Sequence, residues 1–230
     1  RSGRMRSRLV AIVAEGKRGC LFLSPIAEHD QISAQAQPCW RPETQLVGKA
    51  AVNVPLYGLT THADLFNPRQ LVALTTFSNL VAEARERALE DARAAGLPEG
   101  EGIANGGREA RAYADAVAAY LALAVDRSAN YWSSLTPWGG DFIVQTFGRQ
   151  ALPMVWDYAE GNPFSKATGN WMGAIEWISR CLDKSVPAMG IGSAYQFNAT
   201  CSLTNEIPDI LISTDPPYYD NIGYADLSDF

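Results

Sequence analysis

The sequence predicts an α/β protein, and three regions carry this prediction. Residues 8–24 hold two short β-branched or apolar runs with turn residues between them, a pattern typical of a β-hairpin. Residues 67–128 hold two long stretches with apolar side chains spaced by three to four, a pattern typical of paired helices. Near the C-terminus, the run Ile210-Leu211-Ile212 is typical of a buried strand in a parallel sheet.

Composition and charge exclude several classes of protein. With 47% hydrophobic and 19% charged residues, this chain of 230 residues can bury a core and is not of the disordered type. No run approaches the ~20 apolar residues that span a bilayer, and no apolar signal region follows the basic start, so we expect a cytoplasmic protein without a membrane partner. The net charge of −6 argues against nucleic-acid binding over the whole surface. The first 18 residues are basic and could form a phosphate-contacting edge, but a solvated strand and turn is the favoured interpretation.

We expect residues 1–37 to form the β-hairpin and the segment after it. Residues 9–13 and 20–23 are the predicted strands, and residues 15–19 between them have turn chemistry. Residues 38–68 are rich in Pro, Gly and Asn, so we predict an ordered but irregular connector.

The clearest helix begins at Asn67-Pro68, because Asn is a good N-cap and Pro is favoured at the first helical position. We expect it to end at Gly96-Leu97-Pro98, before a glycine-rich surface loop. A second helix is predicted over residues 108–128, and its many alanines favour close packing against the first. The apolar stripe expected on it is Tyr113, Val117, Tyr120 and Ala124.

Residues 130–165 are rich in aromatic side chains. They could supply base-stacking surfaces, but packing within the core and loops is the favoured interpretation. A short helical stripe follows, made of Trp171, Ile175, Ile178 and Leu182. We therefore group residues 38–186 as a mainly helical insertion or connector, and residues 187–230 as the start of a strand–loop segment.

The cysteines and histidines do not form a metal-binding pattern. There is no Cys-x-x-Cys pair, and neither histidine lies at ligand spacing beside a cysteine. We expect no metal site, and free or buried thiols at Cys20, Cys39, Cys181 and Cys201.

The segment that indicates chemistry follows the apolar run of residues 210–212 and reads Asp215-Pro216-Pro217-Tyr218-Tyr219-Asp220-Asn221. In open α/β sheets, ligands bind beyond the carboxyl ends of the strands, which is where this segment would lie. The two prolines fix the backbone and offer carbonyl acceptors without donors. A rigid, acceptor-rich loop beside an aromatic ring suits a pocket for a flat base that bears an amino group.

Methylation of an exocyclic amino group, such as adenine N6, requires a pocket of this kind. Its lone pair is conjugated with the ring, so the nitrogen is a poor nucleophile until acceptors take its N–H bonds. Asp215 Oδ and the Pro216 carbonyl are the candidate acceptors, and Tyr218 can stack on a base turned out of the duplex. Attack on the methyl group of S-adenosylmethionine would follow, with positioning as the main source of rate. The loop continues with the candidate substrate-binding residues Tyr219, Asp220 and Asn221, of which the last two also suit a local Asx turn.

Residues 212–230 closely resemble the catalytic segment of large prokaryotic adenine-specific DNA methylases that carry a zinc ribbon. Residues 57–60 with 64–74, and residues 149–157, resemble the same family. The resemblance implies a class I (Rossmann-like) S-adenosylmethionine-dependent methyltransferase fold with a helical insertion and an N-terminal β-hairpin. It also implies methylation of a flipped adenine in DNA, with a catalytic tetrad of Asp215, Pro216, Pro217 and Tyr218.

Two parts of that family's pattern have no counterpart in this sequence: the glycine-rich loop that binds S-adenosylmethionine and the paired cysteines of the zinc ribbon. The glycine clusters at residues 100–107 and 190–192 follow no strand with an acidic residue at its end, so we interpret them as loops. Both ends of the chain fall where a regular element is expected. We therefore expect an internal fragment of a longer protein, with residues 187–230 as a truncated catalytic segment, no complete cofactor pocket and no activity by itself.

Two other functions stay open on the sequence alone. An amino-methyltransferase acting on RNA or on a protein amide uses a similar strand-end loop, although such enzymes more often carry Asn where this chain has Asp215. A non-catalytic helical module that positions DNA or binds a partner would use the Pro-Pro segment only as a turn. A restriction or phage-defence partner is compatible with the resemblance.

Overall fold

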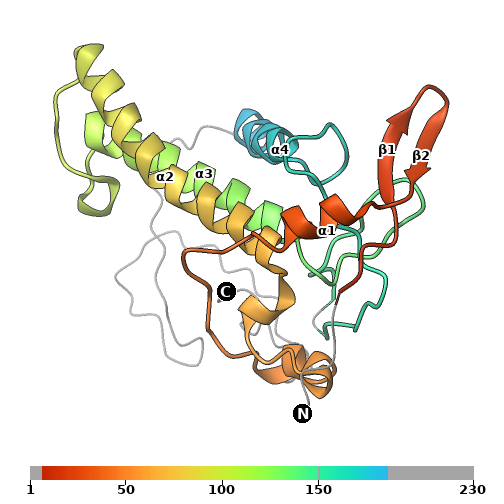
Figure 1. The fold of residues 1–230 in the computed structure, drawn as a ribbon. Coiled ribbons are helices and arrows are strands. Elements are labelled where there is room, and N and C mark those ends of the chain that lie inside the picture. The colour runs from red at the N-terminus through yellow and green to blue at the C-terminus, as the bar shows by residue number, and fades with distance from the viewer. Residues whose placement is uncertain (1–6, 150, 186–230) are drawn as a thin grey trace.

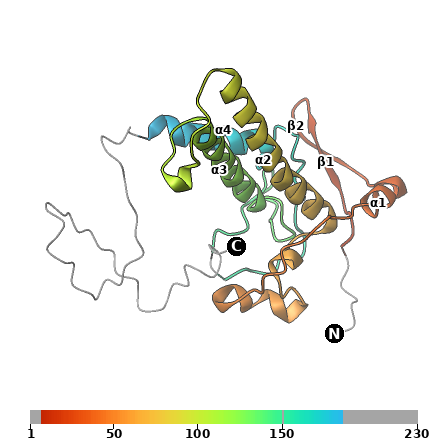
Figure 2. The same ribbon diagram turned by 90° about the vertical axis from the view of Figure 1, so that its left-hand side faces the viewer.

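The computed structural model describes residues 7–149 and 151–185, a part of the chain built around two long helices that lie side by side (Figure 1). The helix α4 lies next to the second of them, and a β-hairpin stands out from the body (Figures 1 and 2). The strands are β1 (Ile12–Gly16) and β2 (Gly19–Leu23), and the α-helices are α1 (Ala27–Ser33), α2 (Pro68–Ala94), α3 (Ala110–Ala129) and α4 (Trp171–Lys184). Short 3-10 turns are η1 (Gly48–Ala51), η2 (Val54–Tyr57), η3 (His62–Leu65) and η4 (Ile103–Asn105).

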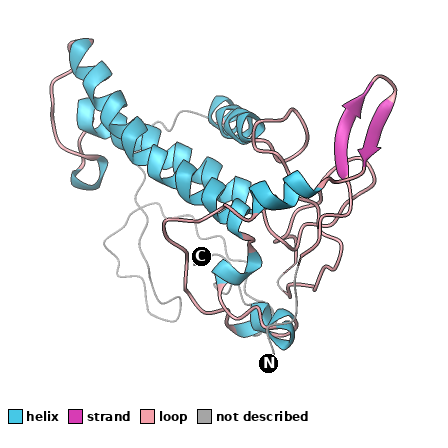
Figure 3. Cartoon of the chain, viewed as in Figure 1, coloured by secondary structure: helices cyan, strands magenta, loops and turns pink. Residues whose placement is uncertain are grey.

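The described part combines helices with one two-stranded sheet, so the predicted mixture of α and β structure holds at this coarse level (Figure 3). A parallel, Rossmann-like sheet is not found in these residues, and the class I methyltransferase fold stays a prediction. None of the helices in this part is long and apolar enough to cross a bilayer.

The predicted β-hairpin is confirmed. Its strands pair antiparallel across a two-residue turn, with Gly16 opposite Gly19, and Gly19 has a φ of 136° that favours glycine. Strand β1 begins at Ile12 rather than at residue 9, because its partner β2 ends at Leu23 and Pro25 has no N–H to extend the ladder.

The connector between the hairpin and α2 is ordered but irregular, as predicted. It turns through η1, η2 and η3, and an isolated bridge joins Gln45 to Thr61. Its backbone is held by hydrogen bonds from Leu46 N to Thr60 O and from His62 N to Thr44 O, both 2.9 Å long.

Helix α2 begins and ends where its capping residues predict. The Asn67 side chain accepts a hydrogen bond from Gln70 N (3.0 Å), and the Gln70 side chain accepts one from Asn67 N (2.8 Å), which is a reciprocal capping box. At the other end Gly96 adopts a φ of 91°, while Leu97 N donates to Ala92 O and Gly96 N donates to Arg93 O. This Schellman pattern satisfies carbonyls that the last turn leaves open.

The predicted helical hairpin is confirmed, but the stripe predicted on its second helix is wrong at two positions. Tyr113 and Tyr120 are 54% and 41% exposed. The buried face of α3 consists of small residues instead, and near the loop Ala110 and Ala114 pack against Leu89 and Ala92 of α2. Alanine permits close approach of two helix backbones, so the bulkier tyrosines lie on the neighbouring, solvated faces.

This tight contact predicts a cost for any larger side chain. We expect Ala114→Leu to lower the free energy of unfolding by about 1–3 kcal/mol, because Ala114 is fully buried and a leucine must push the helices apart. Ala119→Leu, on the exposed face of the same helix, is the matched control and should change stability by less than about 0.5 kcal/mol. Urea unfolding followed by circular dichroism measures both, and equal effects would contradict this packing.

The main core joins the connector, the first half of α2 and the segment after α3. Its centre is Trp132, which is 1% exposed and donates a 2.7 Å hydrogen bond from Nε1 to Gly169 O. The Phe77 ring of α2 contacts Trp132 and stacks on Trp171 at a centroid distance of 4.4 Å. Further buried members are Leu46, Ala50, Val54, Leu65, Phe66, Leu71, Leu74, Ala129, Leu135 and Leu152. The predicted aromatic packing is therefore confirmed for Trp132, whereas Phe164 and Trp156 are 83% and 67% exposed.

Candidate functional site

The residues that the sequence assigns to chemistry, Asp215, Pro216, Pro217, Tyr218, Tyr219, Asp220 and Asn221, lie outside the described residues. Their roles stay predictions. The structure does describe the two other segments that carry the family resemblance, residues 57–60 with 64–74, and residues 149 and 151–157. The region where these two segments meet is the candidate site.

These segments pack into one core although 74 residues, 75–148, lie between them in the chain. Leu65, Leu71 and Leu74 share the main core cluster with Leu152, and Met154 and Val155 pack against it. A hydrogen bond of 3.4 Å from Asn53 Nδ2 to Leu152 O ties the backbone of the second segment to the connector. The sequence pattern did not predict that these two segments pack together.

An exposed aromatic pair lies where the segments come to the surface. The rings of Tyr57 and Trp156 meet edge to face, with centroids 5.1 Å apart and an interplanar angle of 86°. Both rings remain largely exposed. The connector also exposes Val47, Val52 and Leu56. Such rings can pack on a flat partner, as bases do on aromatic platforms.

A polar cluster lies at the start of α2. The guanidinium of Arg69 binds the Glu160 carboxylate through two bonds, Nε to Oε1 (2.7 Å) and Nη2 to Oε2 (2.6 Å). Asn67 Nδ2 donates to Glu160 Oε2 (2.6 Å) and to the Tyr158 hydroxyl (3.2 Å). The hydrogen bonds with Glu160 raise the pKa of Arg69 above its ordinary value. This cluster links the helix start to the segment that follows Trp156.

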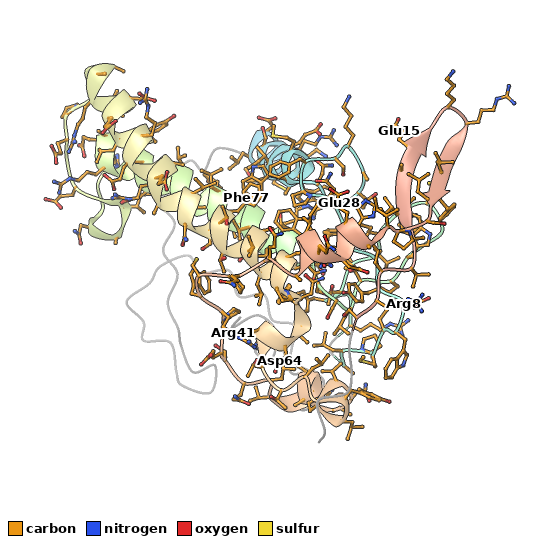
Figure 4. The ribbon with its side chains drawn as sticks, in the orientation of Figure 1. Arg8, Glu15, Glu28, Arg41, Asp64 and Phe77 are labelled. Atoms are coloured by element: carbon orange, nitrogen blue, oxygen red, sulfur yellow. The ribbon has the colours of Figure 1, made fainter. Side chains whose placement is uncertain are left out.

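Asp64 organises the turn before α2. Its carboxylate accepts hydrogen bonds from the backbone N–H groups of Thr60 and Thr61, each 2.9 Å long, and pairs with Arg41 at 3.1 Å (Figure 4). Burial alone would raise the pKa of Asp64, but the hydrogen bonds from Thr61 and Thr60 and the charge of Arg41 outweigh it. The pKa of Asp64 is therefore lowered.

A lowered folded-state pKa makes stability depend on pH. Asp64 contributes stability that is present above the ordinary carboxyl pKa of about 4 and is lost as the pH falls through the lower folded value. We expect Asp64→Asn to reduce the free energy of unfolding by about 1–2 kcal/mol at pH 7, and to flatten its decline between about pH 5 and pH 2. Asp157→Asn removes an exposed carboxylate and should leave the urea-unfolding profile unchanged. A wild-type profile for Asp64→Asn would contradict this role.

A buried hydroxyl cluster follows α3. Ser133 Oγ lies 2.7 Å from Thr146 Oγ1 and accepts a hydrogen bond from Leu135 N, while Thr136 Oγ1 lies 2.8 Å from Ala159 O. Ser134 N donates to Leu65 O at 2.7 Å. Because Ser133 and Thr136 are fully buried and bonded to backbone groups, they hold the loops together.

A hollow of about 190 Å³ lies between the end of α3 and the start of α4. The Arg127 guanidinium stacks over the Trp177 ring at 4.2 Å and lies 5.6 Å from the Tyr131 centroid. The amides of the first α4 turn already have acceptors: Trp171 N bonds Pro163 O, and Gly173 N bonds the Asn170 side chain. We interpret this region as the packing contact between the end of α3 and the start of α4.

Two features of the described residues bear on the cofactor loop and on metal ligands. The glycines of residues 96–107 connect two helices, whereas the cofactor loop of a Rossmann-like fold follows a strand. Across residues 7–149 and 151–185, no three His, Cys, Asp or Glu side chains gather as metal ligands would. Cys20, Cys39 and Cys181 are free and exposed thiols.

Sequence reasoning missed the polar cluster around Glu160. The capping box was recognisable, because Asn67 and Gln70 have the required spacing of three. The partner of Arg69 lies 91 residues away, and nothing in the local pattern marks it. Comparisons with protein-family profiles, with curated proteins and with solved structures found no match to this chain.

Proposed function

We propose that this chain is part of an amino-methyltransferase that transfers a methyl group from S-adenosylmethionine to adenine N6 in DNA. One observation carries the proposal: Asp215-Pro216-Pro217-Tyr218 follows directly on an apolar run typical of a buried strand. In this proposal Asp215 Oδ and the Pro216 carbonyl accept the two N–H bonds of the amino group. Tyr218 stacks on the base, and Pro217 keeps the loop rigid.

The described structure adds indirect support. The two further segments that resemble the adenine-specific methylases contribute to one shared core and emerge at one surface. The exposed pair of Tyr57 and Trp156 at that surface suits contact with a nucleic acid base. The proposal concerns the target-base side of the reaction, and S-adenosylmethionine is proposed only as the methyl donor.

The test is a methyl-transfer assay on the protein encoded by the complete open reading frame. The protein is incubated with tritiated S-adenosylmethionine and unmethylated DNA, and the nucleosides are separated after digestion. We expect label in N6-methyldeoxyadenosine. Parallel reactions contain RNA and a glutamine-containing peptide. Label confined to either of these, or label in cytosine, would refute adenine in DNA as the target.

The exposed aromatic pair favours a second candidate, a module that positions DNA without catalysis. In that case the protein binds DNA but transfers no label. Trp156→Ala then weakens DNA binding, and neither protein methylates DNA. Methyl transfer by the protein would decide against this candidate.

A further inference from the structure

The β-hairpin stands out from the body, and its second strand is the less covered of the two (Figures 1 and 2). All five residues of β2 are exposed, whereas three of the five in β1 are half-buried. The side chains of Leu21, Phe22 and Leu23 are 50%, 59% and 43% exposed. A two-stranded hairpin alone is only marginally stable in water, and additional strands stabilise it. The hairpin therefore presents an apolar strand that a further strand would cover.

The pairing with β1 leaves part of the backbone of β2 without a partner. Gly16 and Gly19 flank the two-residue turn and exchange hydrogen bonds, and such pairs alternate along an antiparallel ladder. Every second residue of β2 from Gly19 on therefore bonds to β1, while the N–H and C=O groups of Cys20 and Phe22 point to the open edge. Within the part of the chain that the structure describes, no other backbone hydrogen bond uses these outward groups.

The open edge of β2 also lacks the features that usually prevent pairing with another chain. Strand edges are commonly protected by charged side chains, by proline or by a covering element. Strand β1 contains Glu15, but β2 consists of Gly, Cys, Leu, Phe and Leu. Among the described residues the sheet has only these two strands. The edge of β2 is thus both unpaired and suited to pairing.

A second copy of this chain fits the edge in an antiparallel arrangement. Around a two-fold axis at Leu21, Cys20 of one copy lies opposite Phe22 of the other. The outward N–H and C=O groups of both residues are then all used, and a shift of either strand leaves some of them unpaired. The two Leu21 side chains meet at the axis on one face of the sheet, where directly opposite residues interact most strongly.

The charges at the two ends of the hairpin favour the same arrangement. Antiparallel pairing brings the tip of one copy, which carries Lys17 and Arg18, beside the residues that follow β2 in the other. Glu28 lies there, in the first turn of α1 (Figure 4). Within the described part of the chain none of these three side chains forms an ion pair. Opposite charges therefore meet at both ends of the paired strands.

We propose that the β2 strands of two copies of this protein pair edge to edge and form a symmetric dimer. The result is a four-stranded antiparallel sheet in the order β1-β2-β2-β1, with Leu21 of both copies at the axis. Each copy contributes one five-residue strand and its tip, so the interface is small and a Kd of about 10–100 μM is expected. The inference does not depend on methyl transfer, so its failure and that of the proposed function are separate.

The experiment is sedimentation equilibrium of the protein from the complete open reading frame, at total concentrations from about 1 to 300 μM, a range chosen to span the expected Kd. We expect a monomer–dimer equilibrium for the wild type. Leu21→Lys and Leu21→Glu each place like charges directly opposite at the axis, and each should weaken the dimer at least about tenfold. In an equimolar mixture of the two variants Lys faces Glu, so dimers should form again.

The mixture also distinguishes lost pairing from lost folding, because two misfolded variants would not restore one another. Val10→Lys is the matched control: it adds the same charge at a position that is 81% exposed and precedes β1, and should leave the Kd unchanged. A wild type that stays monomeric at about 300 μM would overturn the proposal. A dimer that both Leu21 variants retain would also overturn it, since another surface would then form the contact. Failure of the mixture to dimerise would refute the pairing at Leu21.

Discussion

Replacing Asp215 by alanine is expected to lower kcat for methyl transfer at least about 100-fold in the protein from the complete open reading frame. The carboxylate is proposed to accept an N–H bond of the adenine amino group. Without it, the lone pair of that nitrogen stays conjugated with the ring. Because Asp215 is assigned to the target base, the affinity for S-adenosylmethionine should change little. Tritiated methyl transfer measures the first quantity, and isothermal titration calorimetry measures the second.

Two further variants make the Asp215 experiment specific. Asp215→Asn retains one acceptor oxygen at the same place, so it should keep part of the activity. Asp183→Ala removes an exposed carboxylate of α4, outside the candidate site, and should transfer methyl groups at the wild-type rate. If Asp215→Ala also transferred at the wild-type rate, the catalytic assignment of the segment would be wrong.

Replacing Trp132 by alanine is expected to lower the free energy of unfolding by about 3–5 kcal/mol. The ring is 1% exposed and lies against Phe77 of α2, and its Nε1 donates to Gly169 O in the segment before α4. The substitution thus opens a cavity between three parts of the chain and leaves the half-buried Gly169 carbonyl without its donor. Chemical denaturation followed by circular dichroism measures the loss.

Trp156→Ala provides the matched comparison for Trp132. Trp156 is 67% exposed and loses only its edge-to-face contact with Tyr57, so we expect a change below about 1 kcal/mol. Equal destabilisation by the two substitutions would mean that the core is not centred on Trp132. If Trp156 also serves a nucleic acid, its alanine variant should weaken DNA binding while the fold is unaffected.

The proposed chemistry is predicted by the sequence, and the polar cluster at the start of α2 is seen only in the structure. The Asp215–Tyr218 tetrad comes from the sequence, because its chemistry resides in consecutive residues, and it lies outside the described part of the chain. The Arg69–Glu160 pair comes only from the structure. Both are ordinary helix and loop residues until the fold brings positions 69 and 160 within hydrogen-bond distance.

The sequence by itself determined the elements that depend on short-range contacts. The capping box of Asn67 and Gln70 and the left-handed Gly96 act across three to five residues, so local residue types set where α2 begins and ends. Only the tertiary structure decided which side chains are buried. Tyr113 and the alanines of α3 fit the same helical period, but the close approach of α2 admits only the small residues. The choice between them depends on the shape of a partner surface, which no local pattern contains.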